Sequence, residues 1–304
     1  MNKKIILLIS ILTACFFLVQ SSDGFARRNG VDNSPSLKKS TNAVRYLQNI
    51  GNLWTVVSNY GWIGDDAFNN PSFESPGGSG NHYLYQGSIW IGAKDPGGVI
   101  RVTAGDEEEF TQTTDPADTV KHWTKFNVLS DAEKAMGKKR IISDNDTWAE
   151  YTDLDPQYHN TGEGPLGLKV IEQTYGWSAG YNDDFLIFDY QIINIGLKNI
   201  TSSGLPDPND PGTQRTLTDV YVAMRFDFDV SYLGSGEYWY DDLTEYDAAR
   251  KISFGYDGDD PDFPGNDIGE NGTCTGYIYA RLLNSPQTDP NLSGAQLEDT
   301  PVSH

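Results

Sequence analysis

The fold is decided by Leu217-Thr218-Asp219-Val220-Tyr221-Val222-Ala223-Met224-Arg225-Phe226-Asp227-Phe228-Asp229. Its even-numbered positions from 220 to 228 are all apolar, whereas the odd-numbered positions carry Arg225 and three Asp residues. Successive side chains of a strand point to opposite faces of the sheet. The pattern therefore predicts a strand that places one face in a core and the other in water.

Other parts of the chain repeat this period of two. Residues 185–193 carry an apolar face, and their second face mixes apolar residues with Asp189 and Gln191, so we expect a central strand that is buried on both sides. Weaker strand patterns occupy residues 54–59, 83–93, 99–104, 168–177, 251–256 and 276–283. Segments rich in Gly, Pro, Asn and Asp separate them. Together they predict a mainly β fold, an antiparallel β-sandwich of the immunoglobulin-like or jelly-roll-like kind.

One short helix is expected in this β-rich chain. Ser130 and Glu133 have the spacing of a capping box, residues 132–136 suit a helix, and Gly137 can end it. A change in composition near residues 153–164 suggests two β-rich units, residues 43–160 and 161–283. Residues 284–304 lack a strand pattern, and we expect them to be a tail or the truncated end of a longer protein.

The first 26 residues have the pattern of an export signal. Lys3 and Lys4 precede an apolar run over residues 5–19, and Gly24 and Ala26 provide small residues for cleavage. The run is too short for a comfortable membrane span, which needs about 20 residues. Residues 27–42 are polar and predict a flexible lead-in. A lipobox-like sequence ending at Cys15 leaves lipoprotein anchoring as the alternative to a secreted or outer-surface protein without that anchor.

The charge of the chain narrows the classes of partner. Its 43 acidic residues against 22 Lys and Arg give a formal net charge of -21. Nucleic acids and anionic membranes carry the same sign and are repelled. After removal of the first 26 residues Cys274 is the remaining cysteine, so no internal disulfide can form and a hydrophobic core must stabilise the fold. A small buried hydrophobe is the favoured role for that thiol.

Two groups of acidic residues are candidate metal ligands. Asp227 and Asp229 lie two apart and share a strand face, where they could bind a cation, act as acid and base, or face water. The densest acidic stretch contains Asp257, Asp259, Asp260, Asp262 and Asp267. Calcium prefers six to eight oxygen ligands from a flexible loop, but the spacing here is not that of an EF-hand. The sequence thus suggests an irregular structural calcium site, with a simple acidic turn as the alternative.

Aromatic residues suggest a further binding surface. Tyr238, Trp239 and Tyr240 lie close to Gly234 and Gly236, and exposed rings can stack on sugars, although core packing is equally plausible. His82, His122 and His159 are widely spaced and lack a zinc-binding pattern. The chain has no Gly-x-Ser-x-Gly elbow, Walker A loop or dinucleotide-binding glycine pattern.

Three segments together carry a family resemblance: residues 76–93, 184–194 and 217–229. They resemble the N-terminal region of large, mostly uncharacterised secreted proteins of Bacteroidetes-like bacteria. The resemblance spans residues 43–283. Such proteins often end in fibronectin-like or immunoglobulin-like modules and a type IX secretion sorting domain, which this chain lacks. Their motifs have no assigned catalytic residues, so the resemblance transfers none.

These observations favour an exported, non-catalytic binding, adhesion or structural protein with a carbohydrate or protein ligand. Two alternatives stay open at this point. The first is a secreted polysaccharide hydrolase with Asp227 or Asp229 as its acid. The second is an accessory module of a longer secreted protease.

Overall fold

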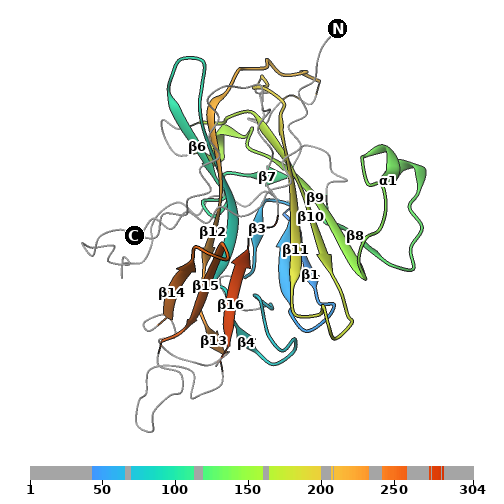
Figure 1. Ribbon diagram of the computed structural model, residues 1–304. Helices are drawn as coiled ribbons and strands as arrows, with labels where there is room; N and C mark the ends of the chain where they lie inside the picture. The colour runs from blue at the N-terminus through green and yellow to red at the C-terminus, as the bar shows by residue number, and fades with distance from the viewer. Residues whose placement is uncertain are drawn as a thin grey trace.

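The structure is a computed structural model that describes residues 43–65, 70–112, 119–159, 164–199, 207, 209–232, 242–258, 274, 276–281 and 283. Antiparallel strands dominate it (Figure 1), and the expectation of a mainly β, sandwich-like fold is confirmed. The expected signal segment, the lead-in and the tail lie outside the described residues.

Two large sheets form the body of the molecule. The first sheet has the order β1-β2-β3-β5-β12, and β6 also pairs with β5. Its strands are β1 (Arg45–Gln48), β2 (Thr55–Ser58), β3 (Trp62–Ile63), β5 (Gln86–Lys94), β6 (Ile100–Ala104) and β12 (Thr218–Asp227). The second sheet has the order β11-β10-β9-β7, and β8 also pairs with β9. Its strands are β7 (Thr111–Gln112), β8 (Lys121–Thr124), β9 (Asn145–Thr152), β10 (Leu168–Gly176) and β11 (Leu186–Asn194).

Smaller elements complete the fold. A three-stranded sheet has the order β14-β15-β16, and a short pair joins β13 to β4. Their bounds are β4 (Asn81–His82), β13 (Ser231–Tyr232), β14 (Asp242–Asp247), β15 (Ile252–Asp257) and β16 (Tyr277–Arg281). One α-helix, α1 (Asp131–Ala135), and a 3-10 turn at Pro156–Tyr158 lie in the connections. In Figure 1, β16 lies between β15 and β11.

A single core holds the two large sheets together. It combines Ile89 and Ile91 of β5 with Val170 of β10 and Ile192 of β11, all of them buried. Cys274 is also buried in this core, in agreement with the expectation that it is a small hydrophobe. Apolar area removed from water is the main stabilising contribution, at about 25 cal/mol per Å².

The margin where β1 meets β8 and β9 is closed by polar contacts. Gln48 and Asn145 exchange hydrogen bonds: Gln48 Nε2 donates to the Asn145 carbonyl at 2.9 Å, and Asn145 Nδ2 donates to Gln48 Oε1 at 2.6 Å. Tyr46 stacks on His122 with ring centroids 4.5 Å apart. Gly176 permits this close approach, because a Cβ there would lie 2.8 Å from Gln48 Nε2.

The prediction for residues 217–229 is correct in the span of the strand but only partly correct in its burial. Met224 and Phe228 are buried as expected, but Val220 is 43% exposed. The pairing of β12 with β5 is irregular at this place, because its register shifts between Thr218 and Tyr221.

Residues 185–193 were expected to form a central strand, and this expectation is wrong. β11 is at the edge of the second sheet and pairs only with β10 in the described structure. Tyr190 and Ile192 are buried, while the other residues of the strand are partly exposed. The expected division near residues 153–164 lies between β9 and β10. β9 pairs with β10 across it and β5 pairs with β12, so residues from both expected units share the sheets and the core.

The expected helix is confirmed as α1. Ser130 accepts a hydrogen bond from the Glu133 backbone, and the Glu133 side chain accepts one from the Ser130 backbone, which completes the capping box. The sequence patterns missed β1, β8, β9 and β14, because these strands carry polar or charged residues on positions that the period of two assigns to a core. Within the described ranges, no helix has the length and apolar character needed to cross a membrane.

Candidate functional site

An apolar opening lies between the edges of β11 and β16, and we call it the β11–β16 groove. It has a cavity volume of about 250 Å³. β11 contributes the consecutive residues 186–190 to its lining, and β16 with the residues after it contributes 278–281 and Leu283. Neither strand pairs with the other, and each is bonded to its own sheet on one side only among the described strands.

The floor of the groove is apolar and belongs to the core. It is formed by Phe73, Leu84, Met224, Phe226 and Phe228. Phe226 and Phe228 stack with ring centroids 5.7 Å apart, so they present a continuous aromatic surface. Core residues therefore form the floor of the groove, and Leu84, Met224 and Phe228 are themselves buried.

Few polar groups line the groove. Asp189 and Arg281 are the charged residues of its lining. Burial raises the pKa of Asp189, and the positive charge of Lys138 opposes that shift. Tyr190 is 2% exposed, lines the groove, and has no hydrogen-bond partner for its hydroxyl within the described part of the chain. A buried hydroxyl without a partner is unusual.

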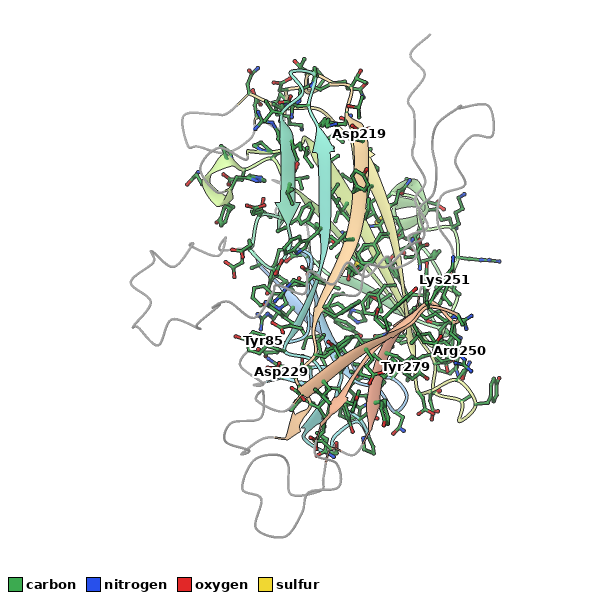
Figure 2. The ribbon with its side chains drawn as sticks, turned by 60° about the vertical axis from the view of Figure 1, so that its left-hand side comes forward. Tyr85, Asp219, Asp229, Arg250, Lys251 and Tyr279 are labelled. Atoms are coloured by element: carbon green, nitrogen blue, oxygen red, sulfur yellow. The ribbon has the colours of Figure 1, made fainter. Side chains whose placement is uncertain are left out.

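The rim of the groove is aromatic and basic on the side of β16. Tyr279 is 62% exposed and is shown in Figure 2 together with Arg250 and Lys251. Arg250 and Lys251 belong to the turn between β14 and β15, and Arg281 lies opposite Ile252 in the register of β15 and β16. Arg250 also pairs with Asp247.

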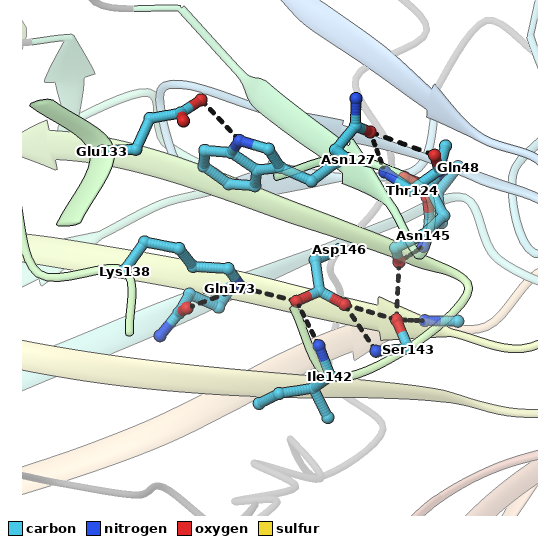
Figure 3. A network of polar contacts seen from close by, with 12 residues as sticks. Gln48, Thr124, Asn127, Glu133, Lys138, Ile142, Ser143, Asn145, Asp146 and Gln173 are labelled. Carbon is cyan, nitrogen blue, oxygen red and sulfur yellow. Dashed lines mark hydrogen bonds and ion pairs between the residues drawn. The ribbon is translucent and has the colours of Figure 1, made fainter. Parts of the chain in front are cut away.

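The outer face of the second sheet is sealed by its own chain, and we call this region the sealed face. The segment 125–144, which contains α1, covers Trp123, Trp148 and Ile171. Beneath it Lys138 and Asp146 form an ion pair of 2.6 Å, with side chains 1% and 0% exposed. Asp146 also accepts from the backbone of Ile142 and from the backbone and hydroxyl of Ser143, as Figure 3 shows.

Lys138, like Asp146, has several interaction partners. Its ammonium donates to Gln173 Oε1 at 3.3 Å and lies 5.3 and 5.1 Å from the ring centroids of Trp123 and Tyr175. Cation–π contacts of this kind stabilise a desolvated ammonium. Because Lys138 and Asp146 are buried and each has polar partners, this network is structural.

A second buried carboxyl lies on the inner face of β10. Glu172 is 2% exposed, and Tyr151 Oη donates to its Oε2 at 2.9 Å. Burial raises the pKa of Glu172 to about 8, and the hydrogen bond from Tyr151 only partly opposes the shift. Glu172 does not line the groove, so it is not placed to act on a ligand there.

Asp227 at the end of β12 and Asp229 just after it do not form a cleft with the groove. Asp227 pairs with Arg225 at 3.0 Å, and Arg225 also pairs with Asp106 at 3.1 Å. Asp229 is 5% exposed, which corrects the expectation that it shares a wet face with Asp227. Figure 2 shows Asp229 well away from Tyr279 of β16, and neither Asp residue lines the groove.

The predicted calcium ligands are only partly described. Asp257 is buried at the end of β15 and lies opposite Asp242 of β14. Asp242 accepts hydrogen bonds from the Val230 backbone at 3.1 and 3.2 Å. The other predicted calcium ligands and the predicted aromatic site lie outside the described residues: Asp259, Asp260, Asp262, Asp267, Tyr238, Trp239 and Tyr240.

The remaining polar candidates are dispersed. His82 Nδ1 accepts from the Ser72 backbone, His122 stacks on Tyr46, and His159 lies 3.7 Å from Glu109. Asp144 forms an ion pair with Lys125, which lowers its pKa to about 2 together with hydrogen bonds from Ser178. Among the residues that the structure describes, no group of three or more His, Cys, Asp and Glu side chains is arranged to hold a metal ion.

Sequence patterns did not identify the groove residues. Phe188 and Ala280 belong to strands that the patterns did find, but the neighbour of each strand was not predictable. Asp189 and Gln191 on the second face of β11 were a usable sign, because a strand buried on both faces rarely carries two polar residues. No family model, curated protein or solved structure matches this chain.

Proposed function

We propose that this chain is an exported, non-catalytic β-sandwich protein of the cell surface or medium, and that it binds a protein or carbohydrate ligand in the β11–β16 groove. The groove is the observation that supports the proposal most strongly. Its floor is formed by core residues, and apolar pockets with a few polar groups are typical of binding sites. The export signal of the first 26 residues and the resemblance to secreted bacterial proteins support the location.

The assignment of the sandwich to the immunoglobulin-like or jelly-roll-like kind is part of the same proposal. Two antiparallel sheets share one core, and strands far apart in sequence, such as β5 and β12, pair within one sheet. Both features are typical of immunoglobulin-like and jelly-roll-like sandwiches.

A structural calcium ion near Asp257 remains a proposal. Directly opposed like charges destabilise a strand pair, and Asp257 and Asp242 occupy directly opposed positions. A cation held with the acidic residues that follow Asp257 would relieve that repulsion. Thermal unfolding with added calcium and with EDTA tests this, and an unchanged midpoint would reject it.

Binding in the groove can be tested with the apolar dye ANS. Ala280 lines the groove on β16, and Ala280→Trp places a bulky side chain in it. We expect dye fluorescence with the wild-type chain and a several-fold smaller signal with Ala280→Trp. Thr244→Trp, on the exposed opposite edge of the same sheet, is the matched control and should behave as the wild type. Equal signals from all three proteins would show that the groove is not the site.

The non-catalytic part of the proposal has a separate test. The chain is incubated with a panel of polysaccharides, and released reducing ends are measured for the wild type and for Asp227→Asn. We expect no release by either protein. Release that disappears in Asp227→Asn would contradict the proposal and support a hydrolase.

A further inference from the structure

We infer that the β11–β16 groove takes up one extended strand of a partner polypeptide, which pairs with β11 on one side and with β16 on the other. This inference rests on the proposed binding role of the groove and names the class of its ligand. The added strand would join the three-stranded sheet to the second sheet, in the order β14-β15-β16-partner-β11-β10-β9. Strand addition to an open sheet edge is a recurrent mode of peptide recognition.

The first support is the state of the two edges. β11 is bonded to β10 along nine residue pairs, and β16 is bonded to β15 along five. Half of the backbone N–H and C=O groups of an edge strand point away from its one neighbour. Within the described chain, no backbone hydrogen bond joins the outer edge of either strand to another segment.

The second support is how these strands line the groove. Side chains of a strand alternate between its faces, so a surface that meets only one face is lined by every second residue. Here residues 186–190 of β11 and 278–281 of β16 are lining residues without interruption. The groove is therefore bordered by the strand edges themselves, where a backbone can pair.

The floor specifies the side chains that the partner must offer. Phe226, Phe228 and Met224 lie beneath the gap, so every second side chain of the added strand should be apolar and point onto them. The cavity of about 250 Å³ lies below the range of about 300 to 1,000 Å³ that is usual for small-molecule pockets. Its size suits a few side chains of a peptide.

The undescribed segments of residues 1–304 are poorly suited to supply that strand. The segments outside the described residues are rich in Gly, Pro, Asp, Asn and Ser. Apart from residues 5–19, which we expect to be removed with the signal, none has an alternating apolar run long enough to fill the groove. A second copy of the chain would have to offer one of its own paired strands.

The test uses a synthetic peptide of about ten residues, the upper length of common strands, in which Val and Phe alternate with Thr and Lys. Binding to the full chain is measured by isothermal titration calorimetry. Two further peptides carry N-methyl groups on alternate residues, one on the odd and one on the even positions. In a strand paired on both sides, each set removes the N–H groups that point to one of the two edges.

We expect the unmodified peptide to bind the wild type and Thr244→Trp equally, and to bind Ala280→Trp much more weakly. Each N-methylated peptide should bind roughly tenfold or more weakly than the unmodified one, because several backbone hydrogen bonds are lost. Equal binding of all three peptides would overturn strand addition but leave the groove as a binding site. No peptide binding, while ANS still distinguishes Ala280→Trp, would also overturn strand addition alone. Self-association that Ala280→Trp abolishes would identify a second copy as the occupant and would likewise overturn the inference.

Discussion

The two sides of the second sheet differ in what completes them. On the sealed face, the segment 125–144 covers the sheet, and Lys138 and Asp146 are buried with all their partners in place. At the β11 margin the chain provides no neighbouring strand among its described residues, and the floor of the groove is apolar. The buried ion pair therefore lies where segment 125–144 covers the second sheet. The apolar groove lies where the edge strand β11 has no described neighbour on one side.

Two buried carboxyl groups show the same difference on a smaller scale. Asp146 accepts four hydrogen bonds, one of them from an ammonium group. Glu172, on the opposite face of the neighbouring strand, accepts one from Tyr151. Burial makes ionisation of Glu172 unfavourable and raises its pKa.

The largest effect is expected on the sealed face. Asp146→Ala leaves the Lys138 ammonium buried without its carboxylate, and we expect a loss of about 3 to 5 kcal/mol in the free energy of unfolding. Denaturant unfolding measures it. Lys134→Met is the matched control, because Lys134 is exposed and its contact with Asp131 is solvated. A loss no larger than that of the control would mean that the sealed face is not tightly closed.

The pH dependence of the free energy of unfolding reports the burial of Glu172. Its pKa is about 8 in the folded chain and about 4.5 when unfolded, so the folded state holds an extra proton between these values. Stability therefore falls as the pH rises through this window, by about 1.4 kcal/mol per pH unit, or about 3 kcal/mol from pH 5.5 to 7.5. Glu172→Gln should remove this slope, and Glu245→Gln, on an exposed strand, should keep it. Parallel pH profiles for wild type and Glu172→Gln would contradict the burial of Glu172.

Substitutions of two isoleucines of β11 allow the stability contributions of the core and of the groove to be compared on one strand. Ile192 is 4% exposed and packs in the core, so Ile192→Ala should lower the free energy of unfolding by about 2 to 3 kcal/mol. Ile187 lines the groove and is partly exposed, so Ile187→Ala should lower it by less than about 1 kcal/mol. Addition of a bound peptide should enlarge the second value. Equal effects in the free chain would indicate that the groove is already covered.

The smallest effect concerns the cap of α1. Ser130→Ala removes the side-chain half of the capping box, and we expect a loss of about 1 kcal/mol. Denaturant unfolding again measures it. An unchanged stability would show that α1 does not help to close the sealed face.

The sequence predicted local features well and spatial neighbours poorly. The period of two located β12, β11 and β10 to within two residues, and the spacing of Ser130 and Glu133 located α1. Alternation reports which face of a strand is apolar, but it does not report which strand lies beside it. The edge position of β11, and with it the groove, depends on pairings between distant segments and was not predictable from one sequence.

The sequence patterns also failed to predict strands that carry polar residues. β9 carries Asn145 and Asp146, which suggest a turn, yet both are buried. Gln48 and Lys138, which come from other parts of the chain, bond to these residues, as does the nearby Ser143. Such compensation follows from tertiary structure, so composition alone gave no sign of it. The predicted calcium ligands beyond Asp257 and the aromatic residues 238–240 stay predictions.

Amide hydrogen exchange tests the central claim most directly, because it reports whether the outer edges of β11 and β16 are open. The full chain is measured alone and with the alternating peptide. We expect alternate amides of residues 186–194 and 277–281 to exchange fast in the free chain and to become protected with the peptide, while the amides of β9 and β10 stay protected in both. Alternate amides of β11 and β16 that are as protected in the free chain as those of β10, or that do not respond to the peptide, would contradict the account.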